Sequence, residues 1–231
     1  MRGVRSRHCT PPSLGDLPMK KPAPAATHWC RTGNGFIFLD LASDRYFTLE
    51  SGAADRFSLI VHRGQDAADD DWLAERGLHN LARPVDRIFP EAIAPTSSYL
   101  DSPGTERASA VDTIRAIYAL ALARRHVRKL RLAQILSTIP QFEPLPAEDQ
   151  RSAARCAAAA FQRARHYFSG MDECLGRGIA IRRVLAGKGC DARLVIGVTL
   201  PFAAHCWVQL GSAVLTDPLD VVLPYTPILI A

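Results

Sequence analysis

Three side chains in the last third of this 231-residue chain could together form a nucleophilic centre: Cys174, His205 and Asp217. A cysteine attacks a carbonyl carbon as its thiolate, which a helix N-terminus and a nearby imidazolium both stabilise. The imidazole in turn needs a carboxylate on its second nitrogen, because that contact fixes its tautomer and orientation. Each residue alone is commonplace, but the three in this order indicate chemistry through a thioester.

The elements predicted around these residues can bring them together. Cys174 falls in the first turn of a helix predicted from about Asp172 to Lys188, after which the period of the sequence drops to two. His205 lies inside a predicted strand, and Asp217 ends the next one, before a proline. The three predicted strands of this region cover residues 193–198, 204–210 and 213–217.

The turn between the last two strands decides whether His205 faces Asp217. A three-residue loop centred on Gly211 places the two residues directly opposite each other, with Cβ atoms ~5 Å apart. A two-residue turn, Gly211-Ser212, slips the register by one and sends Asp217 to the other face. We therefore predict an odd-numbered loop or a β-bulge.

A zinc site is the competing interpretation, with Cys174, Cys190, His205 and Cys206 as ligands. His205 and Cys206 are adjacent in one strand, so their side chains point to opposite faces. Because one strand cannot direct both to a single ion, the sequence favours a site without metal.

The segments upstream predict a second, smaller unit. Strands over residues 36–41 and 46–49 form a hairpin, and a helix over 53–61 follows. A further helix is predicted to start near Asp69-Asp70-Asp71, whose carboxylates suit a helix N-terminus. Beyond a proline-rich stretch, two longer helices are predicted over residues 107–139 and 148–168. This order of helices and strands indicates an α+β fold.

Composition and charge narrow the class of protein. With 48% hydrophobic and 22% charged residues the chain is globular in composition, and no apolar run approaches the ~18 residues that span a bilayer. Its net charge of +5 is uneven: residues 1–31 carry +5, residues 32–106 carry −7 and residues 107–166 carry +7. The one dense basic stretch, Arg124 to Arg131, is best explained as a solvated helix face or as a face that docks on the acidic front segment. We therefore expect no nucleic acid and no membrane among its partners.

The six cysteines are irregularly spaced, contain no C-x-x-C pair and follow no secretory signal. We therefore expect free thiols in a cytoplasmic protein, one of them available as a nucleophile. Residues 1–31 are rich in proline, alanine and basic side chains without periodicity, and are predicted to be a disordered tail.

Four separate motifs resemble those of the lasso-peptide biosynthesis B proteins, which are transglutaminase-like cysteine peptidases. The motifs are Glu173 to Ala180 (ECLGRGIA), Ala192 to Val198 (ARLVIGV), Ala204 to Val208 (AHCWV) and Thr216 to Pro218 (TDP). The resemblance covers about residues 107–231. Departures lie outside the three chemical residues: Gly178 stands where serine is common, Cys206 where alanine is common, and Thr216 where asparagine is common.

This resemblance implies a papain/transglutaminase-like cysteine peptidase domain at residues 97–231, with helices packed on an antiparallel sheet, that removes the leader of a lasso-peptide precursor. It implies Cys174 as the nucleophile, His205 as the base and Asp217 as its orienting carboxylate, without a metal or organic cofactor. The implied partners are the precursor peptide and an asparagine-synthetase-like cyclase. A transglutaminase-like acyltransferase and a non-catalytic precursor-binding scaffold are the alternatives that the residues leave open.

The front segment, residues 32–96, resembles the small winged-helix, PqqD-like domains that recognise precursor leaders. It does so through Phe38 to Leu41, Tyr46 to Glu50 and Gly64. Such a domain binds a leader as an added strand, since an edge strand offers unpaired backbone groups. The resemblance puts a helix over residues 70–81 on the other side of the groove. It implies the binding edge at Tyr46, Phe47, Thr48 and Leu49.

Overall fold

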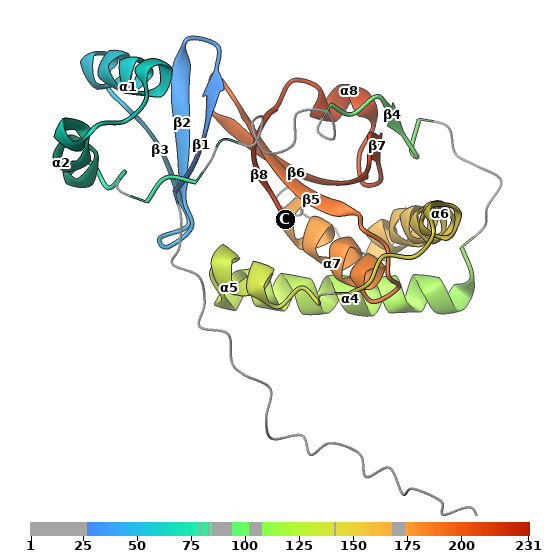
Figure 1. Ribbon diagram of the computed structural model, residues 1–231. Coiled ribbons are helices and arrows are strands. Elements are labelled where there is room, and N and C mark those ends of the chain that lie inside the picture. The colour runs from blue at the N-terminus through green and yellow to red at the C-terminus, as the bar shows by residue number, and fades with distance from the viewer. Residues whose placement is uncertain are drawn as a thin grey trace, which may run out of the picture.

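The computed structural model describes residues 27–78, 80–82, 84, 94–101, 108–140, 142–167 and 174–231. Within these ranges the chain forms two β-sheets accompanied by helices, so the fold is of the α+β class (Figure 1). No helix in the described ranges combines the length and apolarity needed to cross a membrane. Most of the predicted tail, residues 1–26, lies outside the described residues.

The front unit is an antiparallel sheet with two helices. An aromatic cluster holds the sheet and the first helix together, because Trp29, Phe36 and Phe38 all pack edge-to-face on Phe57. Their ring centroids lie 5.0–5.1 Å from that of Phe57, which is 1% exposed. In chain order the elements are β1 (Thr27–Thr32), β2 (Gly35–Asp40), β3 (Arg45–Thr48), α1 (Ser51–Arg63) and α2 (Ala67–Glu75).

In the structure the front unit includes residues before position 32, where it was predicted to start. β1 pairs along its whole length with β2, and five of its six residues fall in the segment predicted to be a tail. Thr27, Trp29 and Cys30 are buried in that strand, so it belongs to the front core. The sequence did not predict this strand, because its six residues show no clear alternation of apolar and polar side chains.

The second helix also differs from its prediction. Asp66 begins α2 with a capping box, and the buried Asp69 carboxylate pairs with Arg63 at 2.7 Å. The helix ends at Glu75, so it does not extend as a groove wall over the described residues 76–78, 80 and 81.

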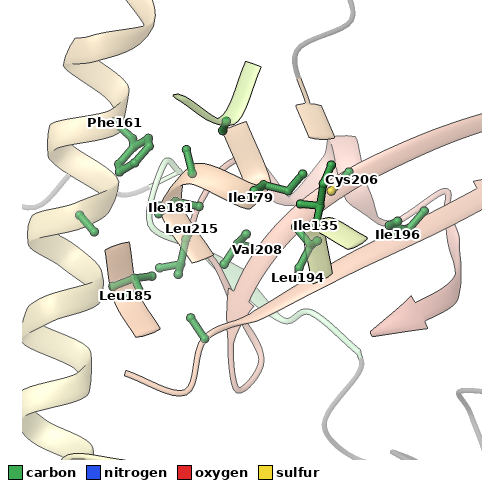
Figure 2. Close-up of a cluster of buried hydrophobic side chains, with 14 of the residues drawn as sticks. Ile135, Phe161, Ile179, Ile181, Leu185, Leu194, Ile196, Cys206, Val208 and Leu215 are labelled. Atoms are coloured by element: carbon green, nitrogen blue, oxygen red, sulfur yellow. The ribbon is translucent and has the colours of Figure 1, made fainter. Parts of the chain in front are cut away.

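The second sheet has the strand order β4-β7-β6-β5-β8. Its strands are β4 (Ser97–Ser98), β5 (Arg193–Thr199), β6 (Ala203–Leu210), β7 (Ala213–Val214) and β8 (Thr226–Ile230). Helix α7 (Cys174–Ala186) packs on β5 and β6, and α4 (Ala110–Lys129) and α6 (Ala147–Ala164) pack on α7. Figure 2 shows this junction, where Ile179 of α7 lies among side chains of the sheet. On the other face Trp207 is covered by Val222 of α8 (Leu219–Val222).

The helix predicted over residues 107–139 is two helices in the structure. α4 ends at Lys129, and α5 (Leu132–Ser137) follows after the extended backbone of Leu130. The interruption coincides with a contact from the front unit: Leu132 N–H donates to both carboxylate oxygens of Asp44 at 3.1 and 3.2 Å. Arg131 also donates to the Ala42 carbonyl. The break is therefore a tertiary effect that helix periodicity does not reveal.

The two units share one buried cluster. Ile37, Leu39 and Leu41 of the front unit lie in the same hydrophobic cluster as Leu132 and Ile179. Truncation between the units would therefore expose apolar surface, so point substitutions are better tests of either one.

Two of the departures from the lasso-protein motifs, Gly178 and Cys206, face each other in the structure. A Cβ atom added at Gly178 would lie 3.0 Å from the Cys206 sulfur and 2.6 Å from Leu194 Cδ1. The Cys206 side chain in β6 thus occupies space that a side chain at position 178 of α7 would need.

We expect Gly178→Ser alone to lower the free energy of unfolding by about 1–3 kcal/mol through overpacking. The double variant Gly178→Ser with Cys206→Ala should recover part of this loss, as measured by urea unfolding. Gly176→Ser is the matched control, because an added Cβ there meets only Arg124 Cγ at 3.6 Å. Equal losses at Gly176 and Gly178, or no recovery in the double variant, would contradict the packing argument.

Candidate active site

Cys174 is the first residue of α7 and is a half-buried free thiol. The first backbone N–H groups of a helix have no partner within the helix and stabilise negative charge. Burial raises the pKa of the Cys174 thiol, but His205 and the backbone N–H groups of Cys206 and Leu175 lower it below its ordinary value. These surroundings favour the thiolate.

His205 lies in β6 at a level where that strand has no neighbour from β7, because β7 pairs only with Gln209 and Leu210. The imidazole Nε2 is 3.4 Å from Oδ1 of Asp217, and the ring lines the same cavity as Cys174. Since Nε2 faces the carboxylate, Nδ1 is the nitrogen left for the sulfur. The structure thus brings the three predicted side chains into one cluster.

The turn prediction was wrong, although His205 and Asp217 still meet. β6 and β7 are joined by the two-residue turn Gly211-Ser212. The strand ends at Val214 and residues 215–217 form a bend, although Leu215 N–H still donates to the Val208 carbonyl at 2.8 Å, so Asp217 does not lie on a strand. Thr216 Oγ1 accepts the backbone N–H of Val208 at 3.0 Å in this bend. Because strand register no longer applies beyond Leu215, the carboxylate can turn toward His205.

Arg177 joins this cluster, and the sequence analysis missed it. It lies three residues after Cys174, on the same face of α7, and its Nη2 donates to Oδ1 of Asp217 at 2.7 Å. The same oxygen faces His205. The side chains of Arg177 and Asp217 are 19% and 8% exposed, so a largely buried carboxylate has a fixed cation. An arginine one turn after a helix-initial cysteine is the signal that could have indicated it.

Burial and pairing act in opposite directions on the ionisation of the cluster. Burial disfavours the His205 imidazolium, but Asp217 and Cys174 outweigh it and raise the pKa of His205 to about 9. Burial acts against the Cys174 thiolate as well, yet contact with His205 leaves the pKa of Cys174 below its ordinary value. Asp217 is likewise buried, and His205 and Arg177 keep the pKa of its carboxyl low. The directions of these shifts together favour a thiolate–imidazolium pair beside an ionised carboxylate.

The other residues weighed as zinc ligands have different surroundings. The Cys190 sulfur donates to the Gln150 carbonyl at 3.6 Å. Cys206 is 3% exposed, and burial raises the pKa of its thiol well above the ordinary value. Among the described residues no three His, Cys, Asp or Glu side chains are grouped as metal ligands.

The four residues expected to bind the leader, Tyr46 to Leu49, do not share one environment in the structure. Phe47 stacks on Phe38 at 5.0 Å, and Leu49 packs on the aromatic cluster of the front unit. Thr48 is exposed. Tyr46 points the other way, toward the second unit, and lines a cavity of about 250 Å³ together with Cys174 and His205. A larger cavity of about 590 Å³ lies between β1 and β8 and contains none of the three chemical side chains.

Comparison with known proteins identifies a family model over the part of the chain that carries this cluster. The family model for the transglutaminase-like superfamily matches residues 113–230, which is half of the chain and includes all three residues of the cluster. The chain therefore belongs to the transglutaminase-like superfamily.

A narrower relationship is also found. A segment of 46 residues is 46% identical to the microcin J25-processing protein McjB of Escherichia coli, and it represents 20% of this chain and 22% of that protein. The match thus spans about a fifth of the relative's length. No solved structure matches this chain. Together the two findings support the resemblance to lasso-peptide biosynthesis B proteins.

The ionisation of the cluster predicts how Cys174 responds to pH. We expect the rate of its alkylation by iodoacetamide to rise with pH through a midpoint below 9.0, the ordinary thiol value, because the thiolate is stabilised. His205→Gln should move this midpoint upward, since it removes the imidazolium. Cys174→Ser gives the background from the other thiols. A midpoint unchanged by His205→Gln would contradict the pairing of the two groups.

Proposed function

We propose that this protein is a cysteine peptidase that removes the leader from a lasso-peptide precursor. The cluster of Cys174, His205 and Asp217 carries the proposal, in a chain of the transglutaminase-like superfamily with a segment similar to a microcin-processing protein. Incubation of the purified protein with a candidate precursor should give two products that sum to the precursor plus one water by mass spectrometry. Intact precursor after prolonged incubation, also with the cyclase added, would contradict the proposal.

The proposed reaction proceeds through a thioester. The Cys174 sulfur attacks the scissile carbonyl carbon, and the amine of the core peptide leaves with a proton from the His205 imidazolium. His205 then takes a proton from water, which attacks the thioester and releases the leader as a carboxylic acid. Asp217 holds the ring through Nε2 during both steps. The backbone N–H of Cys174, at the start of α7, is the proposed donor to the developing oxyanion.

The leader is proposed to bind along β3. No described strand pairs with the outer side of β3, whereas the outer side of β1 is occupied at Thr27. Thr27 N–H donates to the Asn80 carbonyl at 2.9 Å, and the Thr27 carbonyl accepts from Ala82 N–H at 2.9 Å. An added strand therefore has free backbone groups at β3 and not at that end of β1.

This assignment predicts a pattern of hydrogen exchange. Binding of a leader peptide to the Cys174→Ala protein should slow amide exchange in residues 45–49 by about tenfold or more, because an added strand covers their outward N–H groups. Exchange in residues 27–32 serves as the internal control and should not change. Protection of β1 without protection of β3 would rule out the proposed edge.

An acyltransferase is the second candidate, favoured by membership of the transglutaminase-like superfamily. It would use the same thioester and pass the acyl group to an amine instead of water. Adding a primary amine such as glycine methyl ester to the cleavage reaction separates the two, because only acyl transfer gives a product heavier by the amine less water. The free amine of the core peptide is the proposed substrate of an ATP-dependent, asparagine-synthetase-like cyclase.

A further inference from the structure

The cavity beside Cys174 is built from both units of the protein. Leu39 and Tyr46 come from the front sheet, Leu132 and Ile135 from α5, and Ile196 from β5. Cys174 and His205 complete the wall. A peptide whose carbonyl lies at the sulfur would therefore have one of its side chains next to this cavity.

The character of the cavity restricts what it can hold. Its wall is mainly aliphatic, and at about 250 Å³ it is smaller than the ~300–1,000 Å³ typical of cavities for whole ligands. Burial, with the nearby Cys206, Cys174 and Asp44, raises the pKa of the Tyr46 phenol to about 12, so its hydroxyl is neutral. Asp44 also lines the wall, so an anionic side chain entering this cavity would lose hydration and face a like charge.

Tyr46 is held firmly at this wall. Its ring lies 5.3 Å from that of Phe202, which belongs to the second unit. The turn before it is fixed to the junction of α4 and α5, because Asp44 accepts the Leu132 N–H and the Ala42 carbonyl accepts a hydrogen bond from Arg131. The ring position is therefore set by contacts on both sides of the cavity.

We propose that this cavity is the subsite for one apolar side chain of the peptide flanking the scissile bond, and that Tyr46 determines which side chains fit. The proposal rests on the peptidase function proposed above and adds its side-chain specificity. Tyr46 lies in β3, the strand proposed to bind the leader, so one residue connects the recognition edge to the catalytic cavity. A leader on that edge is thereby kept close to Cys174.

The test uses short peptidyl acyloxymethyl ketones, which alkylate active-site cysteines and carry alanine, leucine, phenylalanine or aspartate at the varied position. In the wild-type protein, leucine should inactivate Cys174 at least tenfold faster than aspartate. Tyr46→Ala should reduce the preference for leucine over phenylalanine at least fivefold, because the cavity enlarges, whereas Tyr46→Phe should retain it. Tyr118→Ala, a change of a 71% exposed tyrosine on α4, is the control and should behave as wild type.

The outcomes separate this inference from the function on which it rests. Equal rates for leucine and aspartate, or a preference that Tyr46→Ala leaves unchanged, would overturn the subsite even if the precursor is cleaved. The expected preferences with an uncleaved precursor would instead contradict the peptidase function. Circular dichroism and thermal unfolding of each variant establish that altered rates do not come from misfolding.

Discussion

Replacing Cys174 with alanine should abolish leader removal while leaving leader binding intact. The sulfur is the only group in the proposed mechanism that forms a bond to the substrate, so its loss should reduce cleavage by at least about 10⁵-fold, into the background. The recognition edge at β3 is a separate surface, and the leader Kd should stay within about twofold of wild type. Fluorescence anisotropy of a labelled leader and mass spectrometry of the products measure the two quantities on the same samples.

A second cysteine provides the matched control for this experiment. Cys156 lies on α6 and is a partly buried cysteine that forms no disulfide and lies outside the cluster. Cys156→Ala should therefore cleave at the wild-type rate. If Cys174→Ala retains cleavage, Cys174 is not the nucleophile, and if it loses both cleavage and binding, the variant has lost its structure.

Asp217→Asn should lower the rate of cleavage by about 10³–10⁴-fold, as loss of the orienting carboxylate does in other triads. Asparagine has the same shape but no charge, so it neither selects the ring tautomer nor stabilises the imidazolium. Because pairing with Asp217 helps to raise the pKa of His205 to about 9, the variant should also lower that pKa. Wild-type cleavage should decline as pH rises through about 9, where the imidazolium that protonates the leaving amine is lost. In Asp217→Asn this decline should begin at lower pH.

The control for this substitution lies three residues further along the chain. Asp220 is an exposed carboxylate in the first turn of α8, and Asp220→Asn should keep the wild-type rate and pH profile. A full rate in Asp217→Asn, with a loss in Asp220→Asn, would show that the wrong carboxylate was chosen. Misfolding would instead appear as a lower midpoint of thermal unfolding.

The pairing of Arg177 with Asp217 bears on the same experiment. Arg177 shares Oδ1 of Asp217 with His205, so the cluster holds two positive and two negative charges when the thiolate and imidazolium are formed. A buried carboxylate with a permanently charged guanidinium beside it stays ionised at neutral pH. In Asp217→Asn the Arg177 charge loses its partner, which accounts for part of any loss of stability.

The residues that meet in the candidate site were predictable from the sequence, but their geometry was not. Cys174 at a helix start and His205 in a strand follow from local periodicity, because helix and strand positions are set by residues within a few turns. The contact of His205 with Asp217 was predicted through the wrong turn. The structure makes it through a bend after Val214, where no repeating pattern in the sequence reports the direction of a side chain.

The sequence by itself determined the α+β class, the order of the main helices and strands, and the three residues of the proposed centre. Only the tertiary structure decided the pairing of Arg177 with Asp217, the break between α4 and α5, and the position of Tyr46 beside Cys174. The physical reason is the range of the interactions. Local propensity and hydrophobic period act between near neighbours in the chain, whereas these three features are contacts between residues 40 or more positions apart.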